Sequence, residues 1–293
     1  MKIENIHNSW GSIVHLDNPQ EFFHQPEDFW RDLVYERRLI FFKTVDFTHA
    51  EYAEFSLKFG SPWTEEDYKY SKETSEIVES PNYGKMVISW ISETSKRLGV
   101  SDMPWHADIP NRDHKPFPMR ALWIVDNPRP QISGRTKWLN LELAIDYLTP
   151  DMKELLPRIR IIQQSWYNPG SDIQEHDFLK THPITGKQSL RLNYFNWKQR
   201  TEGWITGVKI DGVLQPDCRL VKEWLEYLER IPELVYEHIW DTKDISIYDN
   251  WPFVHARSRL FLDTNNESRK FYRINIDHLD SQEWAHHKIK YLK

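Results

Sequence analysis

The sequence has little of several features that would define a specialised class of protein. Its single cysteine, Cys218, cannot form an internal disulfide bond and suits a reducing compartment. Its longest apolar stretches, such as Leu39–Phe42 and Leu122–Val125, are far too short to span a bilayer, and the first ten residues, MKIENIHNSW, lack the apolar core of a secretory signal. There is no basic block, and 38 Lys and Arg against 44 Asp and Glu give a net charge of −6, which argues against a nucleic acid partner. We therefore expect a soluble, cytoplasmic globular protein with no membrane and no nucleic acid partner.

Aromatic residues, in contrast, are abundant: the 293 residues include 14 Trp, 13 Tyr and 14 Phe. Large flat side chains of this kind build cores and the contact surfaces of homo-oligomers. They also line enclosed ligand pockets. The sequence alone leaves both uses open, and with them the oligomeric state.

Hydrophobic periodicity predicts many short strands and a few helices. The predicted helices are Pro26–Arg37, Thr48–Phe59, Leu141–Leu148 and Gln215–Arg230. The predicted strands include Arg38–Lys43, Lys85–Ser92, Arg120–Val125, Arg158–Gln163, Asp244–Tyr248, Phe253–Ala256 and Phe271–Asp277. No repeat, low-complexity linker or composition shift divides the chain, so we expect one domain over residues 1–293. Short strands with a few outer helices predict an α+β, mainly β fold around a β-sandwich or jelly roll.

The segment Trp105-His106-Ala107-Asp108 holds the first candidate chemical group. In a strand, residues two apart point to the same face, so His106 and Asp108 would present an imidazole and a carboxylate side by side. Two ligands of one metal ion can come from such a segment. Alone the pattern is weak, because a surface salt pair has the same spacing.

His255 lies 147 residues after Asp108 and follows a strand-like segment. Two imidazoles and one carboxylate form the facial triad of non-haem iron enzymes, which leaves coordination positions open for substrate and dioxygen. A single carboxylate also leaves an Fe(II) site with net positive charge, which favours an anionic co-ligand. A zinc hydrolase uses the same ligand types, and these residues alone leave both kinds of site open.

Two arginines, Arg269 and Arg273, follow His255 in the segment SRKFYRINI. If Phe271–Ile276 is a strand, Phe271, Arg273 and Asn275 share a face, and Arg273 would point inward. The planar guanidinium of a buried arginine binds a carboxylate through two hydrogen bonds, as a 2-oxo diacid bound behind an iron ion would require. A solvent-exposed arginine at the end of a strand is the alternative.

Taken together, five segments of the chain resemble the taurine dioxygenase-like (TauD/TfdA) family of Fe(II)/2-oxoglutarate-dependent oxygenases. The resemblance runs through most of the chain, and the segments occur in the family's order. They are RLIFFKTVDFTHAEYAEFSLKFGSPW, the ligand motif WHAD, GRTKWLNLELAIDYL, THPITGKQSLRLN, and IYDNWPFVHARSRL followed by RKFYRINI. Each match is weak alone, but all five in this order make a chance similarity implausible.

The resemblance implies a cupin-like double-stranded β-helix with flanking helices, and Fe(II), 2-oxoglutarate and O2 as cofactor and cosubstrates. It implies one catalytic metal site with the ligands His106, Asp108 and His255. It also implies that Arg273 and Thr136 bind the distal carboxylate of 2-oxoglutarate, with Arg269 near the cosubstrate. The retained carboxylate favours hydroxylation or another oxygenase outcome over halogenation, because related halogenases have a small residue in its place.

Two departures from the family pattern bear on these roles. The spacing from His255 to Arg273 is a few residues longer than usual, with Asp263–Glu267 as the expected insertion. Arg273 is therefore the first choice for the cosubstrate and Arg269 the second. The segment Gly134-Arg135-Thr136 lacks the acidic residue that often precedes the threonine.

The substrate implied by the resemblance is a small molecule, and we expect an acidic metabolite or a natural-product intermediate, with succinate and CO2 as co-products. Desaturation, cyclisation or oxidative rearrangement at the same iron site is an alternative, and a zinc hydrolase or a non-catalytic cupin-like binding protein is a more distant one. The polar stretch Thr64–Asn82 predicts a long loop and a candidate lid, and Asn193–Trp197 is expected to line the pocket. The side chains expected near the substrate are Trp90, Trp105, Trp197, Arg112, Arg120 and Arg191.

Overall fold

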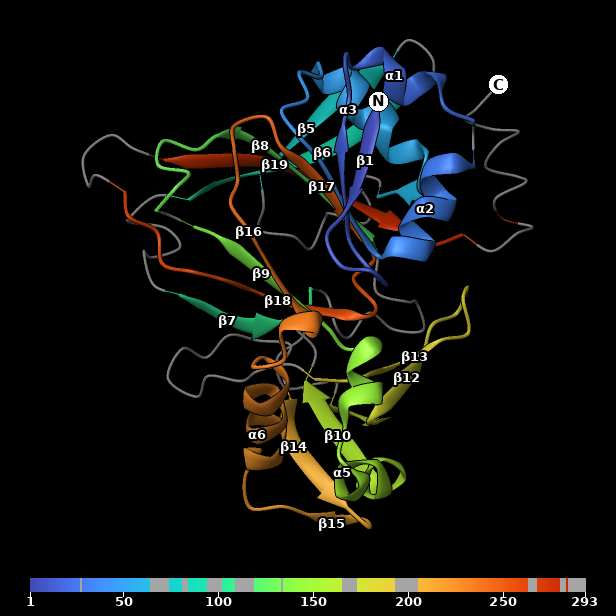
Figure 1. The fold of residues 1–293 in the computed structure, drawn as a ribbon, viewed down its shortest axis with the longest axis vertical. Coiled ribbons are helices and arrows are strands. Elements are labelled where there is room, and N and C mark those ends of the chain that lie inside the picture. The colour runs from blue at the N-terminus through green and yellow to red at the C-terminus, as the bar shows by residue number, and fades with distance from the viewer. Residues whose placement is uncertain are drawn as a thin grey trace.

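The computed structural model describes residues 1–26, 28–63, 74–80, 84–93, 102–108, 119–132, 134–164, 173–192, 205–262, 268–279 and 283. Within these ranges the chain is mainly β with few helices, as the sequence predicts (Figure 1). Its strands form a large sheet and a small sheet, which face each other in the upper part of the molecule, and a further four-stranded sheet below them. No helix of the described residues has the length and apolar character needed to cross a membrane.

The large sheet has nine strands and forms the upper layer (Figure 1). Its strands pair in antiparallel fashion, except for the parallel pair β2–β3. In spatial order they are β1 (Lys2–Asn5), β2 (Ser12–His15), β3 (Leu39–Phe42), β17 (Ile245–Tyr248), β8 (Met119–Asp126), β19 (Arg269–Asp277), β6 (Gly84–Glu93) and β5 (Thr74–Ser80), with β4 (Ser61–Pro62) beside β19.

Helices cover the outer face of the large sheet: α1 (Gln20–His24), α2 (Phe29–Arg37) and α3 (His49–Leu57). Helix α3 begins with a capping box, in which Thr48 accepts from the Glu51 amide and Glu51 accepts from the Thr48 amide. Aromatic rings fill the interface, and Phe22 stacks on Trp30 at 4.9 Å between ring centroids. The abundant aromatic residues therefore serve in part as core.

The small sheet faces the other side of the large sheet and has four antiparallel strands: β16 (Val235–His238), β9 (Thr136–Asn140), β18 (Phe253–Arg257) and β7 (Met103–His106). Buried side chains from both sheets meet between them, among them Phe41 and Tyr248 from the large sheet and Trp138 and Phe253 from the small one. Both metal-ligand histidines predicted from the sequence lie on the small sheet.

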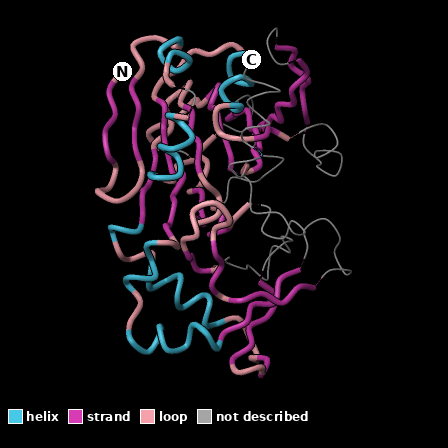
Figure 2. The backbone as a smooth tube through the Cα atoms, turned by 90° about the vertical axis from the view of Figure 1, so that its right-hand side faces the viewer, coloured by secondary structure: helices cyan, strands magenta, loops and turns pink. Residues whose placement is uncertain are grey.

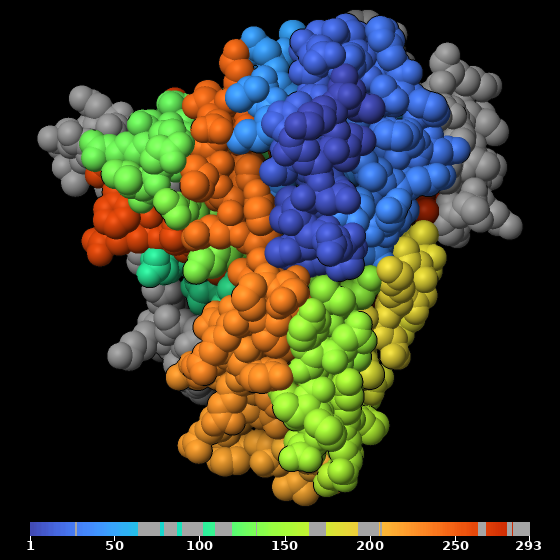
Figure 3. All heavy atoms as spheres, in the orientation of Figure 1, coloured from blue at the N-terminus to red at the C-terminus, as the bar shows by residue number. Residues whose placement is uncertain are grey.

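The lower part of the molecule is built from described residues between 141 and 234, and its core continues into the small sheet at Leu139 and Val254. Residues near 150 and near 220 lie side by side there (Figure 3), and its helices lie on one side of its strands (Figure 2). Its sheet has the order β11 (Ile173–Asp177), β10 (Ile159–Gln164), β14 (Ile205–Ile210) and β15 (Val213–Leu214). The remaining elements are the hairpin β12 (Leu179–Thr181) and β13 (Gln188–Leu190), α5 (Pro150–Leu155), α6 (Arg219–Leu228) and the 3₁₀ turns Leu143–Tyr147, Leu156–Arg158 and Pro232–Leu234.

The predicted strands are confirmed within one or two residues, whereas several other elements differ. The predicted loop Thr64–Asn82 contains strand β5, because pairing with β6 overrides its polar composition. The predicted helix Leu141–Leu148 is a short 3₁₀ turn, and the helix predicted over Pro26–Arg37 begins only at Phe29. Three other stretches lie outside the described residues, namely the rest of the predicted lid, Asn193–Trp197 and the expected insertion Asp263–Glu267. That the whole chain is one domain stays a prediction.

Candidate metal and cosubstrate site

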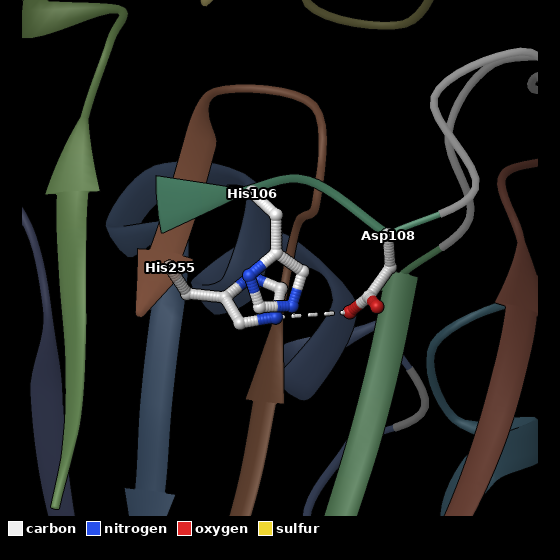
Figure 4. Close-up of side chains that lie close together, drawn as sticks. All are labelled: His106, Asp108 and His255. Carbon is white, nitrogen blue, oxygen red and sulfur yellow. Dashed lines mark ion pairs between the residues drawn. The ribbon is translucent and has the colours of Figure 1, made fainter. Parts of the chain in front are cut away.

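His106, Asp108 and His255 come together between the two facing sheets (Figure 4). His106 ends β7 and lies opposite His255 of β18 in the antiparallel register, and their ring centroids are 4.2 Å apart. Asp108 follows two residues after the end of β7, and one ligand atom from each of the three residues lies within 4.8 Å of the others. The structure thus brings together all three residues that the sequence selects.

The backbone fixes the proton on the His106 ring. Its Nδ1 lies 2.8 Å from the carbonyl oxygen of Pro104, and a carbonyl can only accept, so Nδ1 carries the hydrogen. Nε2 therefore keeps a lone pair for a metal ion. Burial, and then the neighbouring His255, lowers the pKa of His106 to about 4, so this ring is neutral at pH 7.

The carboxylate of Asp108 is held by donors from the large sheet. Its Oδ2 lies 2.6 Å from Nη1 of Arg120 on β8 and accepts a hydrogen bond of 3.0 Å from the Tyr248 hydroxyl on β17. Nε2 of His255 lies 3.2 Å from the same oxygen. Burial favours the neutral acid, but Arg120 and then His255 outweigh it and hold the pKa of Asp108 well below its usual range. The carboxylate is therefore ionised.

This donor set fits a divalent transition metal. Two imidazoles and one ionised carboxylate are the ligands of the facial triad, and imidazole nitrogen suits iron better than magnesium or calcium. The neutral His106 needs no deprotonation before it binds a metal ion. The residues present fit the iron that the sequence resemblance implies.

Thr136 on β9 and Arg269 on β19 both contact the indole ring of Trp240. Nε1 of Trp240 donates a hydrogen bond of 2.8 Å to Oγ1 of Thr136. Because the hydroxyl oxygen accepts this bond, its own hydrogen is available for an anion. Cζ of Arg269 lies 6.0 Å from the Trp240 ring, and its Nη1 donates to the Gly134 carbonyl at 2.6 Å. The two side chains are therefore neighbours.

Arg273 occupies the same face of β19 as Arg269, about 13 Å further along the strand at 3.3 Å per residue. It is 8% exposed, so the prediction that it points inward is confirmed. The next residue on this face, Asn275, accepts a hydrogen bond of 3.0 Å from Arg120. Arg273 thus lies between Arg269 and the group that holds Asp108.

Sequence reasoning missed several residues of the site and placed others only approximately. Arg120 was expected near a substrate acid and instead pairs with Asp108, while Tyr248 and Trp240 carried no motif that marks them. Trp105 donates to Glu229 in the lower part of the molecule, and Arg191 lines a pocket of about 360 Å³ with Lys180 and Trp251. Three predicted side chains lie outside those that the structure describes: Trp90, Arg112 and Trp197.

Comparison with known proteins agrees with this geometry. The model of the "Taurine catabolism dioxygenase TauD, TfdA family" matches residues 2–275. An alkylsulfatase of Acinetobacter baylyi is 24% identical over 263 residues, which cover 82% of this chain and 73% of the relative. Pentalenolactone F synthase of Streptomyces avermitilis is 23% identical over 266 residues, with 80% of each chain covered.

Among solved structures, PvcB of Pseudomonas aeruginosa, described as an iron- and α-ketoglutarate-dependent oxygenase from an isonitrile synthetic pathway, is similar in fold, with a TM-score of 0.67. The match covers 94% of this chain and 91% of PvcB at 16% identity. This level of identity supports the fold, and the family model supports the class of enzyme. The chain therefore belongs to the taurine catabolism dioxygenase TauD, TfdA family and is an iron- and 2-oxoglutarate-dependent dioxygenase.

Proposed function

We propose that this dioxygenase oxidises, by hydroxylation, a C–H bond of a small acidic metabolite, and that His106, Asp108 and His255 hold its iron. The observation that carries the proposal is the convergence of these three side chains, with the hydrogen of the His106 ring directed from Nδ1 to the Pro104 carbonyl. We also propose that the two facing sheets form the double-stranded β-helix of the family. Family membership favours this account over the zinc hydrolase and the non-catalytic binding protein that the ligand types alone left open.

The residues of the site divide the work of binding and orientation. Iron and 2-oxoglutarate, when bound, supply the oxidation of a substrate C–H bond by dioxygen, with succinate and CO2 as co-products. The two imidazoles each contribute a ring nitrogen, and Asp108 contributes the only negative charge of the ligand set. Arg120 and Tyr248 both contact Oδ2 of Asp108, and these contacts fix the orientation of the carboxylate beside His255.

We further propose that Arg269, together with Thr136, binds the distal carboxylate of 2-oxoglutarate. The shared contact with Trp240 and the available hydroxyl hydrogen of Thr136 support this assignment. It reverses the order of preference that the sequence suggests, in which Arg273 comes first. Arg273 would then meet the acidic group of the substrate, because it faces the same layer closer to Asp108.

Titration of 2-oxoglutarate into the Mn(II)-loaded protein tests this division. Arg269→Met should weaken 2-oxoglutarate binding on the order of 100-fold, as expected when a buried charged partner of a carboxylate is removed. Arg273→Met should leave this affinity within a few-fold. Lys270→Met is the matched control, because Lys270 is exposed on the opposite face of the same strand. If Arg273→Met abolishes cosubstrate binding and Arg269→Met does not, the roles are those that the sequence suggests.

The substrate class is tested by succinate release. The name of the alkylsulfatase relative points to an anionic substrate with an alkyl part, so alkyl sulfates, sulfonates and carboxylates form the first panel. We expect at least one of them to raise succinate release above the uncoupled rate, and Arg273→Met to remove this stimulation. No response to any anion in the panel, with stimulation by a neutral compound, would contradict an acidic substrate.

A second candidate outcome uses the same iron site. Pentalenolactone F synthase is named as a synthase, which favours desaturation, cyclisation or oxidative rearrangement in a biosynthetic pathway over simple hydroxylation. Mass analysis of the product separates the two outcomes. Hydroxylation adds one oxygen atom to the substrate, whereas desaturation or ring closure removes two hydrogen atoms without adding oxygen.

A further inference from the structure

A second buried group has the same residue types as the proposed iron site. His182 follows β12, Asp249 follows β17 and His278 follows β19, and one ligand atom from each lies within 4.8 Å of the others. The side chains of all three are fully buried. By composition alone this group is as good a metal site as the first one.

The proton on His182 is placed the opposite way from that on His106. Backbone amides of Ile184 and Thr185 both donate to its Nδ1, each at 3.1 Å. An accepting Nδ1 carries no hydrogen, so in the neutral ring the hydrogen is on Nε2. This Nε2 faces Oδ2 of Asp249 at 3.0 Å, and it has no lone pair to give to a metal ion.

The carboxylate of Asp249 is already surrounded by donors. Besides His182, Nη1 of Arg38 lies 3.4 Å from Oδ2, and the Trp251 amide donates to Oδ1 at 3.0 Å. Nε2 of His278 lies 3.6 Å from Oδ1.

Asp249 is joined to the proposed iron site through its neighbour in sequence. The side chain of Asn250 donates from Nδ2 to the backbone carbonyl of Asp108 at 2.6 Å, and its Oδ1 accepts from the Asp108 amide at 3.4 Å. The Asp249 amide donates to the carbonyl of Arg38 at 2.9 Å. The Asp249–Asn250 pair also begins the turn that leads from β17 into β18, which carries His255.

We infer that His182, Asp249 and His278 do not bind a metal but anchor the turn that positions Asp108. Asp249 fixes the turn to the protein interior, and Asn250 transmits that position to the backbone of the ligand. These are positioning residues, because none of them belongs to the proposed ligand set of His106, Asp108 and His255. The inference rests on the proposed function, since it takes Asp108 as an iron ligand.

Mn(II) titration of the metal-free protein, followed by the EPR signal of the unbound ion, tests the inference. The wild-type chain should bind one Mn(II), and His106→Ala should bind none with comparable affinity. If the wild type binds a second Mn(II), and this binding remains in His106→Ala and disappears in His278→Ala, the second group is a metal site and the inference is wrong. Absence of any binding by the wild-type chain would contradict the proposed iron site itself and the inference with it.

Asn250→Ala separates positioning from stability. It removes the contacts with Asp108 and leaves the buried group intact, so the Kd for Mn(II) should rise 10- to 100-fold, as for other residues that orient metal ligands. Asn140→Ala is the matched control, because Asn140 is also buried and bonds backbone amides of its own turn. It should lower thermal stability and leave the Kd within about twofold. Equal metal affinity in Asn250→Ala and the wild type, measured on folded protein, would overturn the positioning role.

Asp249→Asn provides an independent variant. It removes the negative charge that pairs with Arg38 and keeps the size of the side chain. We expect both a lower melting temperature and weaker Mn(II) binding. Wild-type metal affinity in a folded Asp249→Asn variant would show that the buried group stabilises the fold without positioning Asp108.

Discussion

Gly134 is a position where the smallest change should disturb the cosubstrate site. Its backbone has a positive φ of +64°, and an added Cβ would lie 2.3 Å from Nη1 of Arg269 and 2.6 Å from Cδ2 of Leu260. Gly134→Ala should therefore displace Arg269 as well as strain the backbone, which costs about 1–2 kcal/mol in the left-handed region. We expect weaker 2-oxoglutarate binding by calorimetry and a lower urea midpoint.

Gly186→Ala is the control for backbone strain. Gly186 has a φ of +70°, and no atom lies within 4 Å of a Cβ added there. Backbone strain alone should lower the free energy of unfolding of this variant by about 1–2 kcal/mol. Its affinity for 2-oxoglutarate should equal that of the wild type. Equal affinity in the two variants would show that Gly134 does not set the position of Arg269.

Two histidines make the metal-free protein sensitive to mild acid. Burial lowers the pKa of His106 to about 4, with a further contribution from His255, and burial followed by Arg191 lowers the pKa of His176 to about 4. The unfolded chain binds these protons near pH 6.5, so the folded state loses stability as the pH falls from about 6.5 towards 4. Urea midpoints at pH 7.5, 6 and 5 should decrease in that order.

His176→Gln checks this pH dependence away from the metal ligands. With one of the two titrating groups removed, the fall in urea midpoint between pH 7.5 and 5 should be smaller than in the wild type. A constant midpoint over this range in the wild type would contradict the account. An unchanged slope in the variant would show that His176 is not one of the groups responsible.

At the residue scale, sequence reasoning identified those site residues that belong to one short motif or to one strand. His106 and Asp108 come from a four-residue pattern, and the inward direction of Arg273 follows from strand alternation. Arg120 and Tyr248 can both contact Asp108 because β8 pairs with β17. In this pairing Tyr248 lies opposite Arg120, although the two residues are 128 positions apart in the sequence. Strand order of that kind cannot be read from local periodicity, so the contacts of Arg120 and Tyr248 with Asp108 were missed.

At the scale of elements, buried contacts decide how much a helix end matters. Helix α3 packs five buried residues against the large sheet, whereas α5 has no buried residue. Both begin with a threonine that accepts a backbone hydrogen bond, Thr48 and Thr149. Thr48→Ala should therefore lower the free energy of unfolding by about 1 kcal/mol, and Thr149→Ala by less, as measured by urea denaturation. A larger loss in Thr149→Ala would contradict this ranking.

The predicted elements were most accurate where the apolar pattern was strong. Helix α6 is present as predicted and buries Val221, Trp224, Leu225 and Leu228, although its first turn starts later than predicted. Strand β5 was missed because its sequence TSEIVES is mostly polar, and only its pairing with β6 identifies it. The Leu141–Leu148 pattern was correct in predicting a helical segment but wrong in type, because the segment forms a 3₁₀ turn over Leu143–Tyr147. Asn140 accepts from the Glu142 and Leu143 amides at the start of this turn.

At the scale of the whole molecule, the proposed iron site joins the two facing sheets. Its histidines lie on the small sheet, and the donors that hold Asp108 lie on the large one. A metal ion that binds only the folded protein at 100 times its Kd stabilises it by about 2.7 kcal/mol. Mn(II) should therefore raise the melting temperature of the wild type and leave that of His255→Ala unchanged. An equal rise in both would place the stabilising ion elsewhere.

The overall class was predictable because the five family-like segments occur in order along nearly the whole chain. The lower part was less predictable: of its four-stranded sheet, only the strand at β10 follows from apolar periodicity. Strands β11 and β14 form by pairing with β10, and β15 forms by pairing with β14. The second buried group was missed for the same reason, because His182, Asp249 and His278 converge only after three separate strands have been placed.

The central claim is that His106, Asp108 and His255 hold an iron that 2-oxoglutarate chelates. The most direct test is anaerobic addition of Fe(II) and then 2-oxoglutarate to the purified protein, with the visible absorption spectrum recorded after each step. The account predicts the weak visible charge-transfer band of the chelate, absent in His255→Ala and strongly reduced in Arg269→Met at the same concentrations. If Fe(II) binds to the wild type and no band forms, or if His255→Ala shows the full band, the proposed site is wrong.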